Sequence, residues 1–221
     1  MSPVSPPRPF LKVCGITRAE DADALAALGV DALGFILAPE SPRRVSLKEA
    51  AAILRETPSG PARVGVTVNA APETVREAVR RLGLDAIQAH GEESPATCAA
   101  YGVPVVKAVR TRPGLRAEDL EPYRGFPLLL DGFRDRARGG TGHLADWTLA
   151  GTLVEAGFTL LLAGGLDPSN LARAIETVGP AGVDLNSGVE RSPGVKDVAR
   201  VRRALAILER YPRSEERKRP W

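Results

Sequence analysis

Cysteine is scarce in this sequence: the 221 residues include only Cys14 and Cys98. The two lie far apart and without CxxC spacing, which argues against a disulfide framework and favours reduced thiols in a cytoplasm. Cysteine, histidine and carboxylate residues also lack the spacing of a metal site, so we expect no metal. No GxxxxGK[ST] loop is present, and we expect no cofactor.

Long apolar runs are lacking as well. No stretch approaches the ~18–20 residues that span a bilayer, and the opening MSPVSPPRPF has no apolar core of a secretory signal, so we expect no membrane partner. Charge of one sign is not in large excess, since 30 Lys and Arg oppose 27 Asp and Glu. The one dense basic run, RSEERKRPW, also contains two glutamates, and we expect no nucleic-acid partner.

Short apolar runs alternate with longer amphipathic ones through most of the chain. Strands are predicted at 10–15, 30–37, 62–68, 85–90, 103–109, 126–131, 158–164 and 182–186. Helices are predicted at 17–29, 46–56, 71–83, 94–102, 116–123, 146–157, 167–179 and 194–211, with Ser46 and Glu49 forming a capping box. Most strands are continuous Val, Leu, Ile and Ala runs, which is typical of a parallel sheet buried on both faces.

Eight strand–helix units in about 200 residues predict an α/β protein with a single closed (β/α)8 TIM barrel. The alternative is a doubly wound open sheet, which usually carries its glycine-rich loop after the first strand. Here the glycine-rich loops come late. We place the barrel at 10–211, after a disordered, proline-rich lead-in at 1–9 and before a charged tail at 212–221. No interface stripe stands out, so monomer and homodimer both stay open.

Active sites of such barrels lie at the C-terminal ends of the strands. The polar candidates there are Cys14, Arg43, Arg44, Asn69, Gln88, His90, Lys107, Asp131, Asp184, Asn186 and Ser187. Gln88 and His90 alternate along one strand, so both side chains point the same way, and a polar pair favours the pocket. We expect Gln88, His90 and Asp184 to contact a substrate, although a lone histidine is often structural.

Two glycine-rich loops, AGGLDPSN after the seventh strand and NSGVERSPG after the eighth, are the most specific physical signal. Glycine lets backbone N–H groups approach an anion, and each loop leads into a helix start that favours phosphate. Adjacent late loops of this kind form the usual phosphate site of the fold. The sequence therefore predicts a small phosphorylated ligand at these two loops, which contain Gly164, Gly165, Asn186, Ser187 and Gly188.

Three further residues are candidates for chemistry or substrate binding. Asp131 closes the apolar run FPLLL and is suited to act as a general acid, although a helix cap or salt bridge is the alternative. Cys14 closes the first strand and is either a reactive thiol activated by a nearby cation or a small core residue. Arg43 is suited to bind a carboxylate through two N–H groups at once. The alternative is that it is an ordinary surface arginine.

The segments KVCGITR, DALGFILAPESPRRVS, RVGVTVN, IQAHGEE, VVKAV, LLLDG, GGTGHLADW, LLAGGLDPSNL and GVDLNSGVERSPGVKD together resemble the phosphoribosylanthranilate isomerase family of tryptophan biosynthesis. Single pieces are weak signals. The ordered set, which covers most of residues 10–205, is specific. The resemblance implies a (β/α)8 barrel and a cofactor-independent Amadori rearrangement of N-(5-phosphoribosyl)anthranilate to 1-(2-carboxyphenylamino)-1-deoxyribulose 5-phosphate.

The resemblance also implies roles for residues at matching positions. The cysteine of KVCG, Cys14, would be the general base, and the aspartate of LLLD, Asp131, the general acid. Arg43 would hold the anthranilate carboxylate, and Gly164, Gly165, Ser187 and Gly188 would bind phosphate through backbone N–H groups.

The sequence departs from the family pattern at His143 in GGTGH, at Asn186 in DLNSG and at Ala89 in IQAHGEE. The charged loop 132–143 is either a mobile lid or a disordered insertion. Two other functions stay open from the residues alone: a different sugar-phosphate enzyme, or a non-catalytic phosphosugar-binding protein on the same barrel. The first would need a lysine and glutamate set at the strand ends, and the second could lose both acid and base.

Overall fold

Eight parallel strands close into a barrel in the computed structural model, which describes residues 7–57, 59–132, 146–212 and 219–221. Each strand pairs with its sequence neighbours, and β1 also pairs with β8, so the open-sheet alternative is excluded. The strands are β1 (Phe10–Cys14), β2 (Ala32–Ile36), β3 (Ala62–Thr67), β4 (Ala86–Ala89), β5 (Val105–Arg110), β6 (Leu128–Asp131), β7 (Leu160–Leu162) and β8 (Gly182–Leu185). The predicted (β/α)8 barrel is confirmed.

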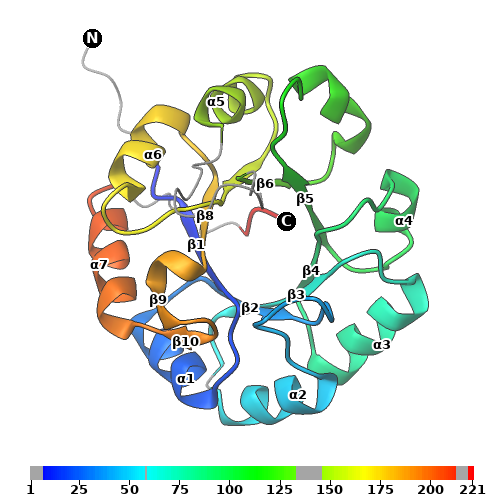
Figure 1. The fold of residues 1–221 in the computed structure, drawn as a ribbon, viewed down its shortest axis with the longest axis vertical. Helices are drawn as coiled ribbons and strands as arrows, with labels where there is room; N and C mark the ends of the chain where they lie inside the picture. The colour runs from blue at the N-terminus through cyan, green and yellow to red at the C-terminus, as the bar shows by residue number, and fades with distance from the viewer. Residues whose placement is uncertain (1–6, 58, 133–145, 213–218) are drawn as a thin grey trace.

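Helices surround this ring of strands (Figure 1). They are α1 (Ala19–Leu28), α2 (Leu47–Glu56), α3 (Pro72–Leu82), α4 (Pro95–Ala99), α5 (Trp147–Glu155), α6 (Leu171–Val178) and α7 (Val198–Leu208), with the 3-10 helices η1 (Ala117–Tyr123) and η2 (Ser187–Val189). The predicted capping box is present at α2, where Ser46 Oγ accepts from the Glu49 N–H and Glu49 Oε2 accepts from the Ser46 N–H.

Two predicted helices begin later than the sequence pattern indicates. The helix predicted from residue 167 begins at Leu171, because Asp167–Asn170 form a turn in which Asn170 Oδ1 accepts from the Asp167 N–H. The helix predicted from residue 194 begins at Val198, since β9 (Glu190–Ser192) and β10 (Val195–Lys196) form a small antiparallel pair before it. The sequence analysis missed this hairpin, and it carries two residues of the site described below.

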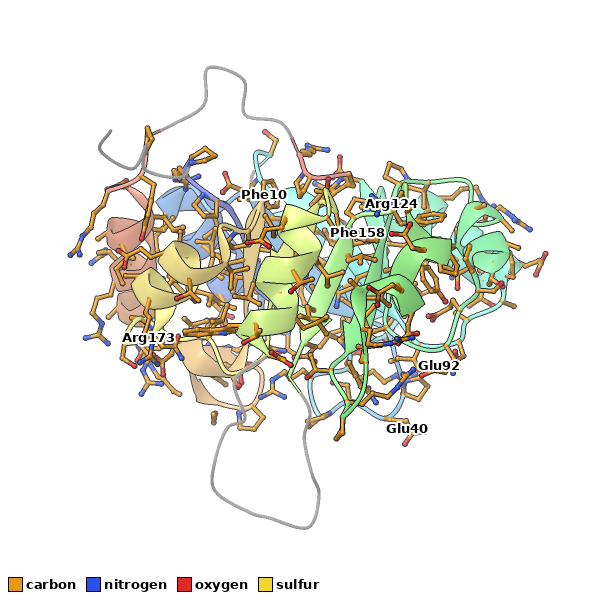
Figure 2. All side chains as sticks on the ribbon, turned by 90° about the horizontal axis from the view of Figure 1, so that it is seen from above. Phe10, Glu40, Glu92, Arg124, Phe158 and Arg173 are labelled. Carbon is orange, nitrogen blue, oxygen red and sulfur yellow. The ribbon has the colours of Figure 1, made fainter. Side chains whose placement is uncertain are left out.

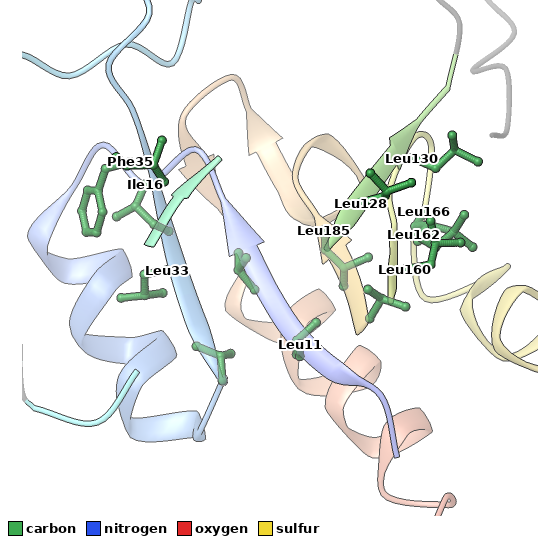
Figure 3. Close-up of a cluster of buried hydrophobic side chains, with 14 of the residues drawn as sticks. Leu11, Ile16, Leu33, Phe35, Leu128, Leu130, Leu160, Leu162, Leu166 and Leu185 are labelled. Carbon is green, nitrogen blue, oxygen red and sulfur yellow. The ribbon is translucent and has the colours of Figure 1, made fainter. Parts of the chain in front are cut away.

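Apolar side chains fill two regions, one on each face of the curved sheet. The larger lies between strands and helices and includes Leu11, Leu33, Phe35 and Leu185, all essentially unexposed (Figure 3). Side chains of alternate parity point into the barrel, as strand geometry requires. At the N-terminal end of the strands this interior is apolar, with Trp221 packed against the inner residues and edge-on to Phe10 at 5.1 Å between ring centroids.

The two ends of the barrel differ in what they carry. Figure 2 shows Phe10 near one end and the loop residues Glu40 and Glu92 near the other. The described part of the expected lead-in is tied to the barrel, since Arg8 pairs with Asp31 at 3.1 Å and donates its N–H to the Pro212 carbonyl. Residues 1–6 and 213–218 lie outside the described residues, so the lead-in and tail otherwise stay predictions.

Candidate active site

Cys14 and Asp131 lie on the same rim of the barrel. Each is the last residue of its strand, β1 and β6 respectively, and all eight strands run parallel around the closed ring. The rim therefore combines a thiol and a carboxyl group from strands that are not neighbours. This is the arrangement in which an acid and a base can reach different atoms of one bound molecule.

The Cys14 thiol is buried, with 4% of the residue exposed, beside the apolar side chains of Ile36, Ala38 and Val66. Burial raises the pKa of Cys14 above its usual value, while the nearby Lys12 ammonium opposes the rise. Gly34 of β2 leaves the room for this arrangement. A Cβ added there would lie 2.8 Å from Cys14 Sγ and 3.1 Å from Lys12 Nζ.

Lys12 precedes Cys14 by two residues on β1, so its side chain also points into the barrel. Its Nζ donates to Asp184 Oδ2 of β8 at 2.8 Å, and the two residues are 1% and 7% exposed. Burial alone would lower the pKa of Lys12, but Asp184 and Cys14 raise it, so the lysine keeps its charge. Asp184 was a predicted substrate contact, whereas Lys12 was missed. The signal was a single charged residue inside the apolar run FLKVC.

The predicted pair Gln88 and His90 reaches the rim beside Asp131. Gln88 Nε2 and His90 Nδ1 are 2.9 Å apart, which shows that the two side chains point the same way, as expected. His90 Nε2 lies 3.5 Å from Asp131 Oδ2. The Asp131 side chain is one-third exposed (33%), so a ligand in the mouth can reach it.

Arg43 follows β2 and enters the rim from the side. Its Nε and Nη2 donate to both carboxylate oxygens of Glu190, with Nη2 and Oε2 2.6 Å apart. Glu190 also accepts from Lys196 Nζ at 2.8 Å and from the Gly194 N–H at 3.1 Å. Glu190 and Lys196 belong to the β9–β10 hairpin, and the sequence analysis missed both because it read this segment as loop and helix.

The two glycine-rich loops touch one another at the rim. Gly188, in the first turn of η2, packs so closely on the Leu166 carbonyl and the Asp167 side chain that a Cβ would overlap them. Gly164 and Gly165 both adopt positive φ, at 77° and 68°. The first turn of a helix presents N–H groups that the helix itself does not use, so the paired loops are the candidate site for the predicted phosphate.

Ser187 begins η2 beside these loops, whereas the Asn186 side chain is occupied elsewhere. Asn186 Oδ1 accepts from Lys196 Nζ at 3.0 Å and lies against Gly15. The prediction that Asn186 binds phosphate is therefore limited to its backbone. The carbonyl of Gly165 accepts from Asn170 Nδ2 at 2.9 Å, which fixes the turn after β7.

Other polar candidates serve the fold. Lys107 Nζ donates to Glu93 Oε2 at 3.0 Å and to carbonyls at the end of β4, so it ties loops together away from the mouth. Asn69, which follows β3 and has a φ of 49°, accepts from the N–H of Glu92 in the loop after β4. The loop proposed as a lid, 132–143, and His143 lie outside the described residues beyond Gly132.

Within the described part of the chain, no group of three His, Cys, Asp or Glu residues could hold a metal ion, and none of its helices is long and apolar enough to cross a membrane.

Comparison with known proteins shows to which family the chain belongs. The family model described as N-(5'phosphoribosyl)anthranilate (PRA) isomerase matches residues 11–206, which span every strand of the barrel and both glycine-rich loops. The chain belongs to this family.

Individual members of this isomerase family are similar to the chain in sequence and in structure. N-(5'-phosphoribosyl)anthranilate isomerase of Myxococcus xanthus is 48% identical over 196 residues, covering 87% of this chain and 92% of the relative. The crystal structure of phosphoribosyl anthranilate isomerase from Thermotoga maritima superposes with a TM-score of 0.82 at 37% identity, covering 91% and 98% of the two chains. A further structure of such an isomerase contains reduced 1-(o-carboxyphenylamino)-1-deoxyribulose 5-phosphate, with a TM-score of 0.79, 36% identity and the same coverage.

Proposed function

We propose that this isomerase converts N-(5-phosphoribosyl)anthranilate to 1-(2-carboxyphenylamino)-1-deoxyribulose 5-phosphate, with Asp131 as general acid and Cys14 as general base. The observation that carries the proposal is the shared rim. Thiol, carboxyl group and paired glycine-rich loops all lie at the C-terminal ends of the strands, beside an arginine. A ligand with a phosphate and a carboxylate fits this set of groups.

The substrate is held at its two charged ends. N–H groups of Gly165, Ser187 and Gly188 bind the phosphate, and the Arg43 guanidinium binds the anthranilate carboxylate. Glu190 holds Arg43 by Nε and Nη2. Binding at both ends places the ribose ring between Cys14 and Asp131, which converts two proton transfers into reactions within one complex.

The first proton transfer opens the ring. Asp131 donates its proton to the ring oxygen, the C1–O bond breaks, and the nitrogen lone pair forms the C1=N bond. Neighbouring His90, 3.5 Å away, orients the Asp131 carboxyl group. The second transfer is from C2 to the Cys14 thiolate, and the C–H electron pair forms the C1=C2 bond while nitrogen regains its lone pair. Proton return to C1 and loss of the C2 hydroxyl proton give the ketone, so no atom is gained or lost.

The alternatives left open by the sequence are a different sugar-phosphate enzyme and a binding protein without catalysis. Both are disfavoured by family membership and by the presence of acid and base on one rim. We also propose a cytoplasmic location, supported by two free cysteines, and a monomeric or homodimeric state.

Decay of the fluorescence of enzymatically made phosphoribosylanthranilate on addition of the purified chain tests the function. We expect turnover that requires no added metal or cofactor. Absence of turnover in folded protein, judged by a cooperative melting curve, would refute the proposal. Gel filtration coupled to light scattering separates monomer from dimer.

A further inference from the structure

The Lys12–Asp184 ion pair is deeply buried in the barrel, and the reaction scheme above leaves it without a task. Taking two charges out of water is costly, and an apolar pair of the same volume is often as stable. Both residues are nearly unexposed and directly opposite one another in the β1–β8 register. A pair in this position, immediately below the reactive thiol, invites a functional explanation.

Strand geometry brings Lys12 to Cys14. The two residues are two apart on β1, so their side chains share the inner face. Sγ and Nζ both lie against the Cα of Gly34, because a Cβ there would be 2.8 Å from one and 3.1 Å from the other. The nearby Lys12 ammonium lowers the pKa of Cys14, against the effect of burial. No larger residue at position 34 permits this approach.

Asp184 is placed to keep the lysine charged. It accepts from Nζ through Oδ2 at 2.8 Å, while Oδ1 is buried and accepts no hydrogen bond from the residues that the structure describes. Burial raises the pKa of Asp184, and Lys12 opposes the rise. The carboxylate thus binds Lys12 through one of its two oxygens.

We propose that Lys12 is a positioning residue for Cys14. The Lys12 ammonium, anchored by Asp184, stabilises the Cys14 thiolate that accepts the C2 proton. The inference rests on the proposed role of Cys14 as base and names the group that makes it effective. A thiol in an apolar pocket otherwise supplies little thiolate near neutral pH, because burial disfavours the charged form.

Other charges face Cys14 from the surrounding elements and set the background. Lys196 of β10 and Arg43 after β2 are cations, both held by Glu190. Asp131 at the end of β6 and His90, which follows β4, act on Asp184 from farther away. Lys12 differs from these because it lies on the same inner face of β1 as Cys14 and pairs with a buried carboxylate of the adjacent strand β8.

The test measures the ionisation of Cys14 directly and without substrate. In a Cys98→Ala background, protein labelled with 13C at the cysteine β-carbon gives one cysteine resonance, whose position reports thiol or thiolate as pH is varied. We expect Lys12→Met to move the titration midpoint upward by at least one pH unit. Asp184→Asn should move it downward, because a negative charge is lost beside Cys14 and the thiolate that forms serves in its place as the counter-ion of Lys12.

Opposite shifts distinguish an electrostatic role from simple damage to the core. If Lys12→Met does not fold, the double variant Lys12→Met/Asp184→Leu replaces the pair with apolar groups, and its midpoint should lie above that of the parent. A midpoint that stays or falls in the Lys12 variant that folds would overturn the proposal. The ascending limb of kcat/KM against pH should move with the thiol, with at least a tenfold loss at pH 7.5.

The titration of the Cys14 thiol can be interpreted without the reaction scheme. If Cys14→Ala retained normal turnover, the assignment of the base would fail, yet the titration would still show whether Lys12 controls the thiol. Conversely, an unshifted titration with inactive Cys14→Ala would leave the base in place and remove Lys12 from the mechanism.

Discussion

Arg43 and Glu190 form a side-on pair in which Nε and Nη2 of the guanidinium meet both carboxylate oxygens. The pair joins the loop after β2 to the β9–β10 hairpin, 147 residues later in the chain. Glu190 is 6% exposed and also binds Lys196, so it is fixed before a substrate arrives. Hydrogen bonds from Arg43 and Lys196 lower the pKa of Glu190, although burial acts in the opposite direction. The carboxylate is therefore a charged anchor for the arginine that we assign to carboxylate binding.

Glu190→Gln should release Arg43 from this anchor. We expect KM for phosphoribosylanthranilate to rise about tenfold, a change of about 1.4 kcal/mol, with a smaller effect on kcat. Arg43→Ala should raise KM by at least as much. If Glu190 acts through Arg43, the double variant will lose no more than Arg43→Ala alone. Additive losses in steady-state kinetics would show that Glu190 has a separate role.

Cys14→Ala should abolish proton removal from C2 while leaving binding intact. We expect kcat to fall by a factor of about 10²–10⁴, the usual contribution of a general base. Binding of the reduced product analogue, measured by calorimetry, should change little because the thiol contributes little to affinity. Cys98→Ala is the matched control, since Cys98 is buried in α4 away from the rim. Turnover near normal in Cys14→Ala would reassign the base.

Asp131→Asn should remove the proton donor without changing the shape of the side chain. We expect kcat to fall by about 10²–10⁴, with the melting temperature near that of the parent. Asp23→Asn on the exposed side of α1 controls for loss of a carboxylate and should be fully active. Substantial activity in Asp131→Asn would contradict the assignment of the acid.

Gly188→Ala should push the two glycine-rich loops apart. The added Cβ would overlap the Leu166 carbonyl and the Asp167 side chain, and both belong to the loop after β7. We expect a stability loss of about 1–3 kcal/mol by urea unfolding, together with a raised KM and weaker inhibition by inorganic phosphate. Gly151→Ala in α5 is the control, because a Cβ there meets nothing within 4 Å. It should leave KM unchanged and stabilise by about 0.5–1 kcal/mol.

Stability should fall as pH drops below about 4. Burial would raise the pKa of Glu93, but hydrogen bonds, including one from Lys107, lower it, and the pKa of Glu190 is lowered likewise. A lowered native pKa gives stability that is present above the unfolded value of about 4.3 and is lost as pH falls through the native value.

Urea unfolding between pH 6 and pH 2.5 measures this dependence. Glu93→Gln leaves Lys107 buried without its carboxylate, so we expect it to be less stable at pH 6 by about 3 kcal/mol. Its stability should decline less steeply with acid than that of the parent. An equal slope in parent and variant would show that Glu93 does not carry the acid sensitivity.

The sequence by itself determined the fold class and the strand ends at which the candidate residues lie. Continuous apolar strands alternating with amphipathic helices predict the barrel, because a parallel strand is covered on both faces. Strand ends then identify Cys14, Asp131, Gln88 and His90 without reference to contacts, since the fold places all C-terminal strand ends on one rim. The late glycines predict the candidate phosphate site in the same way.

Only the tertiary structure decided which charges meet. Lys12 and Asp184 are 172 residues apart, and Arg43 and Glu190 are 147 apart, so no local pattern links them. Their pairing follows from closure of β1 on β8 and from the β9–β10 hairpin, which replaces the expected start of the last helix. A buried charge needs a partner of opposite charge, and the strand register, rather than the neighbouring residues in the sequence, determines which residue lies opposite it.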